Sequence, residues 1–309
     1  MLGFIKNLVG GLALISFTVV GGIANSASCP KSGGILKYGV KAEPPTYDMH
    51  GTNSYAVMHF VAQHYSTLLT FDWNKFPKLE GDVADSWNVS SDGLTYTFKI
   101  KKGIKFHDGT PLTSKDVKAT YDRLRNPPEG VISVRKALFS SISGITTPDD
   151  NTVVFKLSSP DAFMLDGFAS PFNAIYSAKD IAKDPKWHLK NINGTGPYKF
   201  VAHKKGESWK AEKFADFHHG DNCLDGTESF RIKKVAEPLI GGQIMAEWRG
   251  TAPPERVLLK KEMGDNVSFQ AKTLMTLWVV SLNSKTKAFQ NKKVRQAINM
   301  CIDRHTGLK

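Results

Sequence analysis

The stretch from 86 to 100 constrains the fold more than any other part of the chain. From 94 to 100, apolar side chains (Leu94, Tyr96, Phe98 and Ile100) alternate with polar ones. A period of two is that of a half-buried strand. The Ser91-Asp92-Gly93 run before it has the composition of a tight turn, and 86–90 supplies the partner strand. The sequence therefore predicts a β-hairpin over this stretch.

Helical periodicity occurs on both sides of the hairpin. Apolar residues from 54 to 69 recur at helical spacing, and 113–116 resembles an N-terminal cap for a helix over 117–124. Further strands are predicted over 34–40, 152–157, 198–201, 229–235 and 276–282. The chain therefore belongs to the mixed α/β class.

Composition excludes several other classes. The 309 residues are 41% hydrophobic and 23% charged, which is ordinary for globular proteins and excludes disorder. This length suits two domains or one large one. The net charge of +12 comes from scattered basic residues without a run of five. Such dispersion indicates a solvated surface, so no nucleic-acid partner is expected.

The amino terminus predicts export. Residues 1–27 combine a positive Lys6, an apolar stretch over 8–24 and then small side chains, which is typical of a cleaved signal peptide. Two alternatives stay open, namely an uncleaved anchor and a lipid-modified form at Cys29. In an oxidising compartment, Cys29 and Cys223 can form a disulfide. Cys301, on a helical pattern, is expected to pack as a small buried side chain.

The final predicted helix lacks a covering element. Between 292 and 301, Val294, Ala297, Ile298 and Cys301 fall on one helical face. The chain stops at Lys309. We therefore expect a reading frame truncated at its carboxyl end.

Several motifs occur in a fixed order along the chain. They are the runs at 34–39 with 45–48, 82–87, 92–98, KFHDGTPL at 105–112 followed by 116–117, GTGPY at 194–198, and VRQAI at 294–298 with 302–304. By these runs the chain resembles the extracellular solute-binding proteins of family 5, which serve ABC importers of oligopeptides, dipeptides and nickel. Two runs depart from the family pattern: 242–245 lacks both acidic residues of a GExD segment, and 217–220 lacks an aromatic of a YWxG run.

The resemblance implies a two-lobed clamp of the periplasmic-binding-protein type (type II). The expected division is a signal peptide (1–27), the first lobe in two parts (28–60 and 191–284), an inserted mixed α/β subdomain (61–190), and the start of a largely missing second lobe (285–309). The chain would represent mostly the first lobe.

The resemblance also implies a function. A periplasmic receptor, with a lipid-anchored form as an alternative, would bind a peptide-like solute between its lobes and deliver it to the permease subunits in the inner membrane. No enzymatic activity and no cofactor are implied, and the full-length protein would be a monomer. The present chain alone is expected to bind solute weakly or not at all.

Four residues are candidate solute contacts. Glu43 and Tyr47 follow the first strand, where a carboxylate can meet a peptide's ammonium group. Trp278 and Asn283 lie on or after a late strand, where an aromatic side chain can line a pocket. The competing interpretation is a solvated Glu43, a packed Tyr47 and a core position for Trp278.

Two clusters carry other chemistry. His107-Asp108 has the residue types of acid–base catalysis, but beside Gly109 it indicates a turn. The loop residues Asp216, His218, His219, Asp221 and Cys223 can ligate a metal, yet their spacing favours a solvated loop. We therefore expect neither a catalytic nor a metal site.

The alternatives to a transport receptor are a secreted hydrolase and a non-transport receptor or chaperone on the same scaffold.

Overall fold

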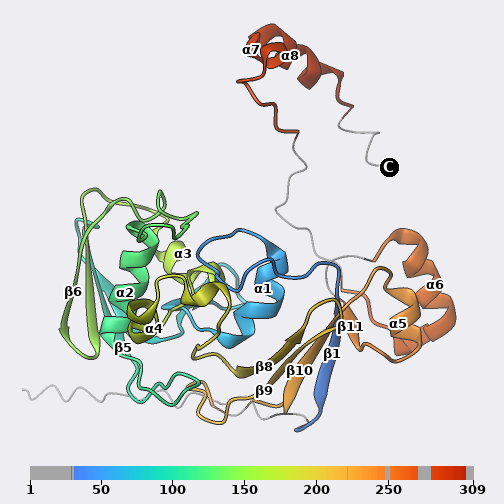
Figure 1. Ribbon diagram of the computed structural model, residues 1–309, viewed down its shortest axis with the longest axis horizontal. Coiled ribbons are helices and arrows are strands. Elements are labelled where there is room, and N and C mark those ends of the chain that lie inside the picture. The colour runs from blue at the N-terminus through green and yellow to red at the C-terminus, as the bar shows by residue number, and fades with distance from the viewer. Residues whose placement is uncertain (1–28, 30, 221, 248–250, 271–279, 304–309) are drawn as a thin grey trace, which may run out of the picture. The chain divides into compact units, whose positions relative to one another are not determined.

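The computed structural model describes residues 29, 31–220, 222–247, 251–270 and 280–303 (Figure 1). The predicted signal peptide and most of the strand predicted over 276–282 lie outside these residues. The chain divides into two compact units, one ending at Gly264 and one beginning at Asp265. None of the helices among the described residues has the length and apolar character needed to cross a bilayer.

The larger unit contains a five-stranded sheet assembled from distant parts of the chain. Its strands, in the spatial order β11-β1-β10-β9-β8, are β11 (Ala246–Glu247), β1 (Ile35–Val40), β10 (Gly226–Arg231), β9 (Ser208–Lys213) and β8 (Tyr198–Lys204). Strand β1 runs parallel to both of its neighbours, whereas β10, β9 and β8 form an antiparallel meander. The first strand of the fold therefore pairs with residues that follow it in the chain by 191 positions in β10 and 208 positions in β11.

A second sheet is built from one continuous stretch. It has the antiparallel order β4-β5-β7-β6, with β4 (Ala84–Val89), β5 (Thr95–Ile100), β7 (Thr152–Leu157) and β6 (Ile142–Asp149). The pairing of β4 with β5 confirms the predicted hairpin. This sheet falls within the range 61–190 of the expected insertion, although the boundaries themselves stay a prediction.

The helices fit the sequence signals to different degrees. Helix α2 (Ser114–Arg125) packs on β6 and β7, and begins with a capping box between Thr113 and Asp116, as the sequence predicts. The helix predicted over 54–69 is shorter: α1 (Tyr55–Val61) continues only as η1 (Ala62–His64). The physical reason is that the carbonyl of His64 accepts the N–H of Gly196, so the chain leaves helical geometry there.

The remaining elements are short. They are β2 (Leu69–Phe71) paired with β3 (Leu79–Gly81), α3 (Met164–Ala169), η2 (Pro171–Asn173), α4 (Ala178–Lys183), η3 (Trp187–Leu189), α5 (Ala236–Ile240), α6 (Pro253–Met263), η4 (Gly264–Asn266), α7 (Lys287–Gln290) and α8 (Lys292–Cys301).

In the smaller unit, α8 confirms the predicted last helix, and the Asn291 side chain caps it. The side chain of Cys301 is exposed, so its expected burial is wrong, because the described residues of this unit place nothing over that face.

Two apolar clusters fill the larger unit. One lies between the four-stranded sheet and helices α2 and α3, where Tyr121 and Phe168 pack edge to face at 5.1 Å between ring centroids. The other joins α1 to the five-stranded sheet through Phe60 and Trp209.

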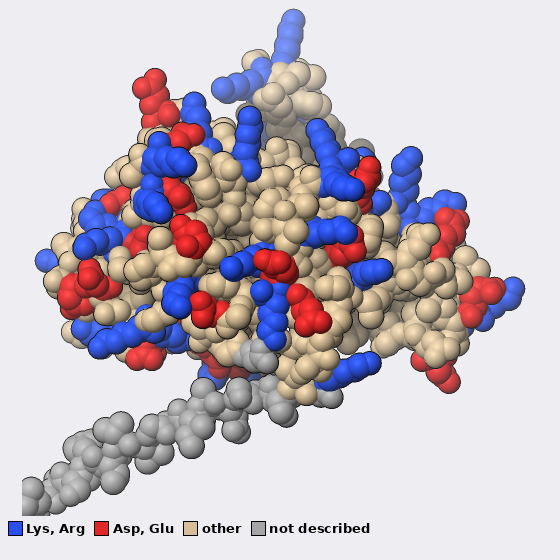
Figure 2. Space-filling model, turned by 60° about the horizontal axis from the view of Figure 1, so that its bottom comes forward, with Lys and Arg blue, Asp and Glu red and all other residues tan. Residues whose placement is uncertain are grey.

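Basic and acidic side chains are interspersed on the face shown in Figure 2, in agreement with the dispersed charge of the sequence.

The turn at 194–198 is packed against the end of η1 so closely that only glycine fits at position 194. A Cβ at Gly194 would lie 1.9 Å from the carbonyl oxygen of His64, a backbone atom that cannot rotate away. We expect Gly194→Ala to lower the free energy of unfolding by about 2–3 kcal/mol. Gly144→Ala is the matched control, because nothing lies within 4 Å of the Cβ it would add. Equal urea midpoints for the two variants would contradict this packing.

His64 is a buried histidine that must stay neutral. Its Nδ1 donates to the carbonyl of Tyr198 (2.7 Å), and its Nε2 accepts from the indole N–H of Trp209 (3.1 Å). Protonation would remove that acceptor. Burial lowers the pKa of His64 to about 3.

This histidine makes stability depend on pH. Because the pKa is lower in the folded state, stability is lost as pH falls below the unfolded value of about 6.5 and continues to fall until about pH 3. We expect His64 to contribute a loss of about 2 kcal/mol between pH 7 and pH 5. Urea denaturation at both pH values should show a smaller loss for His64→Gln. An unchanged pH dependence in that variant would refute the assignment.

Candidate functional site

The loop that follows β1 lies where parallel strands end. We call residues 41–54 the post-β1 loop. Strand β1 and both of its parallel neighbours end on the same side, and ligands of open α/β sheets bind outside the carboxyl ends of such strands. Two of the predicted contacts, Glu43 and Tyr47, belong to this loop.

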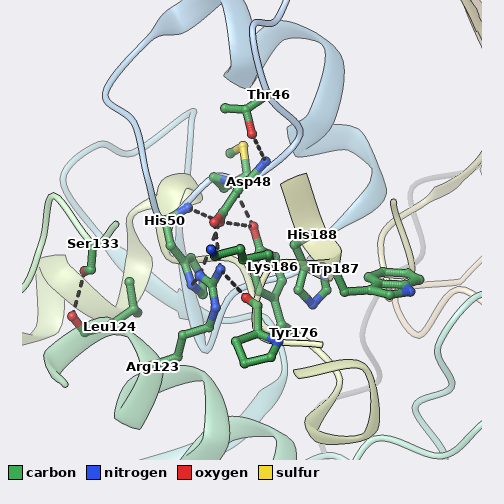
Figure 3. Close-up of polar contacts among 12 residues, drawn as sticks. Thr46, Asp48, His50, Arg123, Leu124, Ser133, Tyr176, Lys186, Trp187 and His188 are labelled. Carbon is green, nitrogen blue, oxygen red and sulfur yellow. Dashed lines mark hydrogen bonds and ion pairs between the residues drawn. The ribbon is translucent and has the colours of Figure 1, made fainter. Parts of the chain in front are cut away.

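A buried ion pair anchors the centre of the loop (Figure 3). The guanidinium of Arg123, from α2, donates two hydrogen bonds to the carboxylate of Asp48 at 2.7 and 3.3 Å. Both side chains are at most 2% exposed. The hydroxyl of Tyr176 donates to the same carboxylate at 3.1 Å. Burial raises the pKa of Asp48, but the guanidinium of Arg123 and the backbone N–H of His50, which both donate to the carboxylate, outweigh it and hold the pKa below its usual value.

His50 completes this network as a neutral ring. Arg123 donates to its Nδ1 at 2.9 Å, so its Nε2 carries the proton and donates to the carbonyl of Ala174 at 2.8 Å. The ring stacks on Tyr176 with centroids 4.1 Å apart. Burial lowers the pKa of His50 to about 3, which keeps the ring uncharged beside the guanidinium.

A second arginine fixes the end of the loop. Arg135 donates to the backbone carbonyls of Met49, His50 and Thr52 and to the side-chain oxygen of Asn53. Its guanidinium also lies over the ring of Phe172, 4.6 Å from the centroid. The two arginines thus hold the post-β1 loop in one conformation. The loop therefore loses less conformational entropy when a ligand binds.

The structure brings Glu43 and Tyr47 together at the β8–β9 turn. The Tyr47 hydroxyl lies 2.8 Å from Nδ1 of His203, and the Glu43 carboxylate lies 3.6 Å from Nε2 of the same ring. Glu43 also accepts the N–H of Gly206 at 2.5 Å and is 16% exposed. The ring of Tyr47 packs edge to face on Trp209. Glu43 is therefore tied to the hairpin rather than solvated.

His203 was not a predicted site residue. Its strand, β8, does not alternate cleanly in burial, so no periodicity points to this position. The only sequence signal is that 198–204 begins at the last residue of the GTGPY run. In the family that this chain resembles, that run returns the chain to the first lobe.

A small pocket opens beside the anchored part of the loop. Its volume is about 230 Å³, and its lining combines the apolar residues Val131, Ile132 and Leu189 with the Asp48–Arg123 pair. Ile132 is 68% exposed, so one wall faces solvent. Apolar walls with a few fixed polar groups are typical of ligand sites.

The other two predicted contacts are not placed with these. Trp278 lies outside the described residues. Asn283 belongs to the smaller unit, where its side-chain oxygen accepts the N–H of Lys285 at 3.0 Å. Their role therefore stays a prediction.

The His107-Asp108 pair forms a turn, as the sequence indicated. Asp108 accepts from the backbone N–H and the hydroxyl of Thr110, and Gly109 has a φ of 84°. The Nε2 of His107 donates to the carbonyl of Gly196 at 3.0 Å, and burial lowers its pKa to about 4. The Asp108 side chain is occupied in holding the local turn and that of His107 in holding the distant backbone of Gly196, which does not favour the hydrolase alternative.

The ligand-capable loop residues separate into different contacts. Asp216 forms an ion pair with Lys105 (3.1 Å), and Cys223 forms a disulfide with Cys29, whose Cα atoms are 5.4 Å apart. Asp221 lies outside the described residues. His218 and His219 instead approach Asp82, which the sequence did not single out.

Known structures define the class of protein. The fold is that of two-lobed periplasmic binding proteins of type II. The ABC transporter-associated periplasmic binding protein DppA of Helicobacter pylori, solved with the peptide STSA, aligns with a TM-score of 0.75 and 27% identity over 88% of this chain and 57% of its own. The oligopeptide-binding protein AppA of Bacillus subtilis, solved with a nonapeptide, aligns with a TM-score of 0.75 and 26% identity over 89% and 55%.

Sequence comparison then identifies the family. The chain belongs to the bacterial extracellular solute-binding proteins, family 5, whose model matches residues 78–308. It is 31% identical to the glutathione-binding protein GsiB of Pectobacterium atrosepticum over 243 residues, 77% of this chain and 46% of that protein. Against GsiB of Escherichia coli K12 it is 31% identical over 267 residues, 85% and 50%. The chain thus spans about half the length of these relatives, which are named as binding proteins and not as enzymes.

Proposed function

We propose that the chain is part of an exported solute receptor of an ABC importer, which binds a peptide-like solute and delivers it to the membrane permease. The observation that carries this proposal is the post-β1 loop, held by Arg123 and Arg135 beside a pocket that the loop itself helps to line. Family membership and the peptides named in the two solved relatives support it. The receptor would act in the periplasm. The disulfide to Cys223 occupies the sulfur of Cys29 to which a lipid would be attached, so it does not favour the lipid-anchored alternative.

The groups around the loop suit a peptide. The second carboxylate oxygen of Glu43 can accept from a terminal ammonium group, while the first holds Gly206. The pocket walls of Val131, Ile132 and Leu189 suit an apolar side chain. Glutathione, a tripeptide bound by the curated relatives, belongs to the same chemical class.

The proposed mechanism is lobe closure without covalent chemistry. The lobe divided between 28–60 and 191–284 would present the anchored loop, and a second lobe beginning within 285–309 would close over the solute. Trp278 and Asn283 would contact the solute from the connection between the lobes. The full-length receptor would act as a monomer, and no enzymatic step is required.

A thermal-shift screen of a full-length receptor that carries both lobes tests the proposal, because the present chain alone is expected to bind solute weakly or not at all. Short peptides and glutathione at millimolar concentration should raise the melting temperature by about 2–4 °C if the ligand exceeds its Kd about tenfold. Glu43→Gln should reduce this shift. Glu207→Gln, at an exposed position of the same β8–β9 turn, is the matched control and should retain it. Failure of every peptide to stabilise the full-length receptor would count against a peptide-like solute.

A further inference from the structure

Three metal-ligating side chains meet where the chain enters β4. The Nε2 atoms of His218 and His219 each lie 2.9 Å from the same oxygen, Oδ1 of Asp82. The three ligand atoms lie within 4.8 Å of one another. The side chains of His218 and Asp82 are 6% and 13% exposed, whereas that of His219 is 37% exposed. One side of the cluster is therefore closed and the other opens to solvent.

The surrounding contacts direct all three groups to one point. The second oxygen of Asp82 accepts the N–H of Thr67 at 2.7 Å, which leaves Oδ1 to the histidines. Phe217 packs against both imidazole rings, with centroids 4.9 and 5.4 Å away. Gly220, with a φ of 96°, turns the chain directly after His219. The convergence is therefore fixed by the fold and does not depend on one flexible side chain.

We propose that Asp82, His218 and His219 form a binding site for a divalent transition-metal ion of the Zn²⁺ class. Two imidazole nitrogens and one carboxylate oxygen are ligands that Zn²⁺ accepts, and the exposed side leaves a fourth position for water. The proton that each Nε2 donates to Asp82 is replaced by the metal on binding and leaves to solvent.

The spacing of the ligand atoms fits an ion of this size. Bonds of 2.0–2.2 Å in tetrahedral geometry place neighbouring ligand atoms about 3.3 Å apart. The two N···O distances of 2.9 Å need to lengthen by only about 0.4 Å, and the two imidazole nitrogens, which lie within 4.8 Å of each other, must also come to about this spacing. The exposed ring of His219 can supply this adjustment. Lys101, the nearby ammonium, donates to the carbonyl of Gly81 and does not occupy Oδ1.

The site would link two parts of the lobe that are far apart in sequence. Asp82 lies between β3 and β4, whereas the histidines lie on the loop between β9 and β10, more than 130 residues later. A metal bound there joins the four-stranded subdomain to the five-stranded sheet. This role is separate from solute binding at the post-β1 loop.

Titration of the purified chain with Zn²⁺ alone tests the site. We expect one ion per chain by calorimetry, and with Co²⁺ the visible absorption of a tetrahedral complex with nitrogen ligands. His219→Gln should weaken Zn²⁺ binding by about tenfold or more, and Asp82→Asn by a similar factor. Because the His219 ring is largely exposed, its replacement should leave the fold intact, as circular dichroism can verify.

A matched carboxylate provides the control. Asp85 is an exposed acidic residue three positions from Asp82, and Asp85→Asn should change the Zn²⁺ affinity less than twofold. Absence of saturable Zn²⁺ binding would overturn the proposal. So would a Zn²⁺ affinity that is the same in His219→Gln, Asp82→Asn and the unmodified chain.

Discussion

Replacing Arg123 with Met should lower the free energy of unfolding by about 3–5 kcal/mol, as is typical when one partner of a buried ion pair is removed. The substitution leaves the carboxylate of Asp48 about 2% exposed without its cation, and removes the donor to His50. Urea denaturation followed by far-ultraviolet circular dichroism measures the change. Because the pair anchors the post-β1 loop, peptide binding should weaken as well.

Two further variants make this prediction specific. Lys118→Met removes the solvent-accessible partner of Asp122 on the same helix and should cost less than about 0.5 kcal/mol. Asp48→Asn combined with Arg123→Met removes the unpaired charge and should be less destabilised than Arg123→Met alone. A loss below about 1 kcal/mol for Arg123→Met would show that the pair does not anchor the loop.

Replacing Cys29 and Cys223 together with serine should have an effect of similar size. The disulfide closes a loop between residues 194 apart, and removing such a constraint from the unfolded chain costs up to about 5 kcal/mol in the loop-entropy model. The midpoint of thermal or urea unfolding measures the loss, and added reductant should reproduce it in the unmodified chain.

The third cysteine supplies the control for this experiment. Cys301 is exposed and free, so Cys301→Ser should leave the unfolding midpoint unchanged. If the Cys29/Cys223 double variant unfolded at the same denaturant concentration as the unmodified chain, the disulfide would not constrain the fold.

Local structure could be predicted because its causes are local. The β4–β5 hairpin follows from alternation and turn residues between 86 and 100, and α2 follows from the cap at Thr113 and Asp116. The helix after Ser54 was predicted too long, because its end is set by Gly196, more than 130 residues later. Periodicity holds no information about such a contact.

Within the candidate site, only the residues that come directly after a strand could be proposed from the sequence. Glu43 and Tyr47 could be proposed because residues after a first strand occupy its carboxyl edge, and their contact with a solute stays a prediction. Arg123 and His203 were missed, since they reach the loop from a helix and a hairpin that lie 75 and 156 residues away from Asp48 and Tyr47. Likewise, the two adjacent histidines pointed to a metal only weakly until folding placed Asp82 beside them.

Residue-resolved NMR of the chain, titrated with a short peptide, tests the central claim most directly. Solute binding at the anchored loop predicts saturable shifts of the backbone amides within 41–54 and around Ile132, with little change in the four-stranded sheet. Saturable shifts that are confined to other regions would contradict the assignment of this loop as the solute-binding surface.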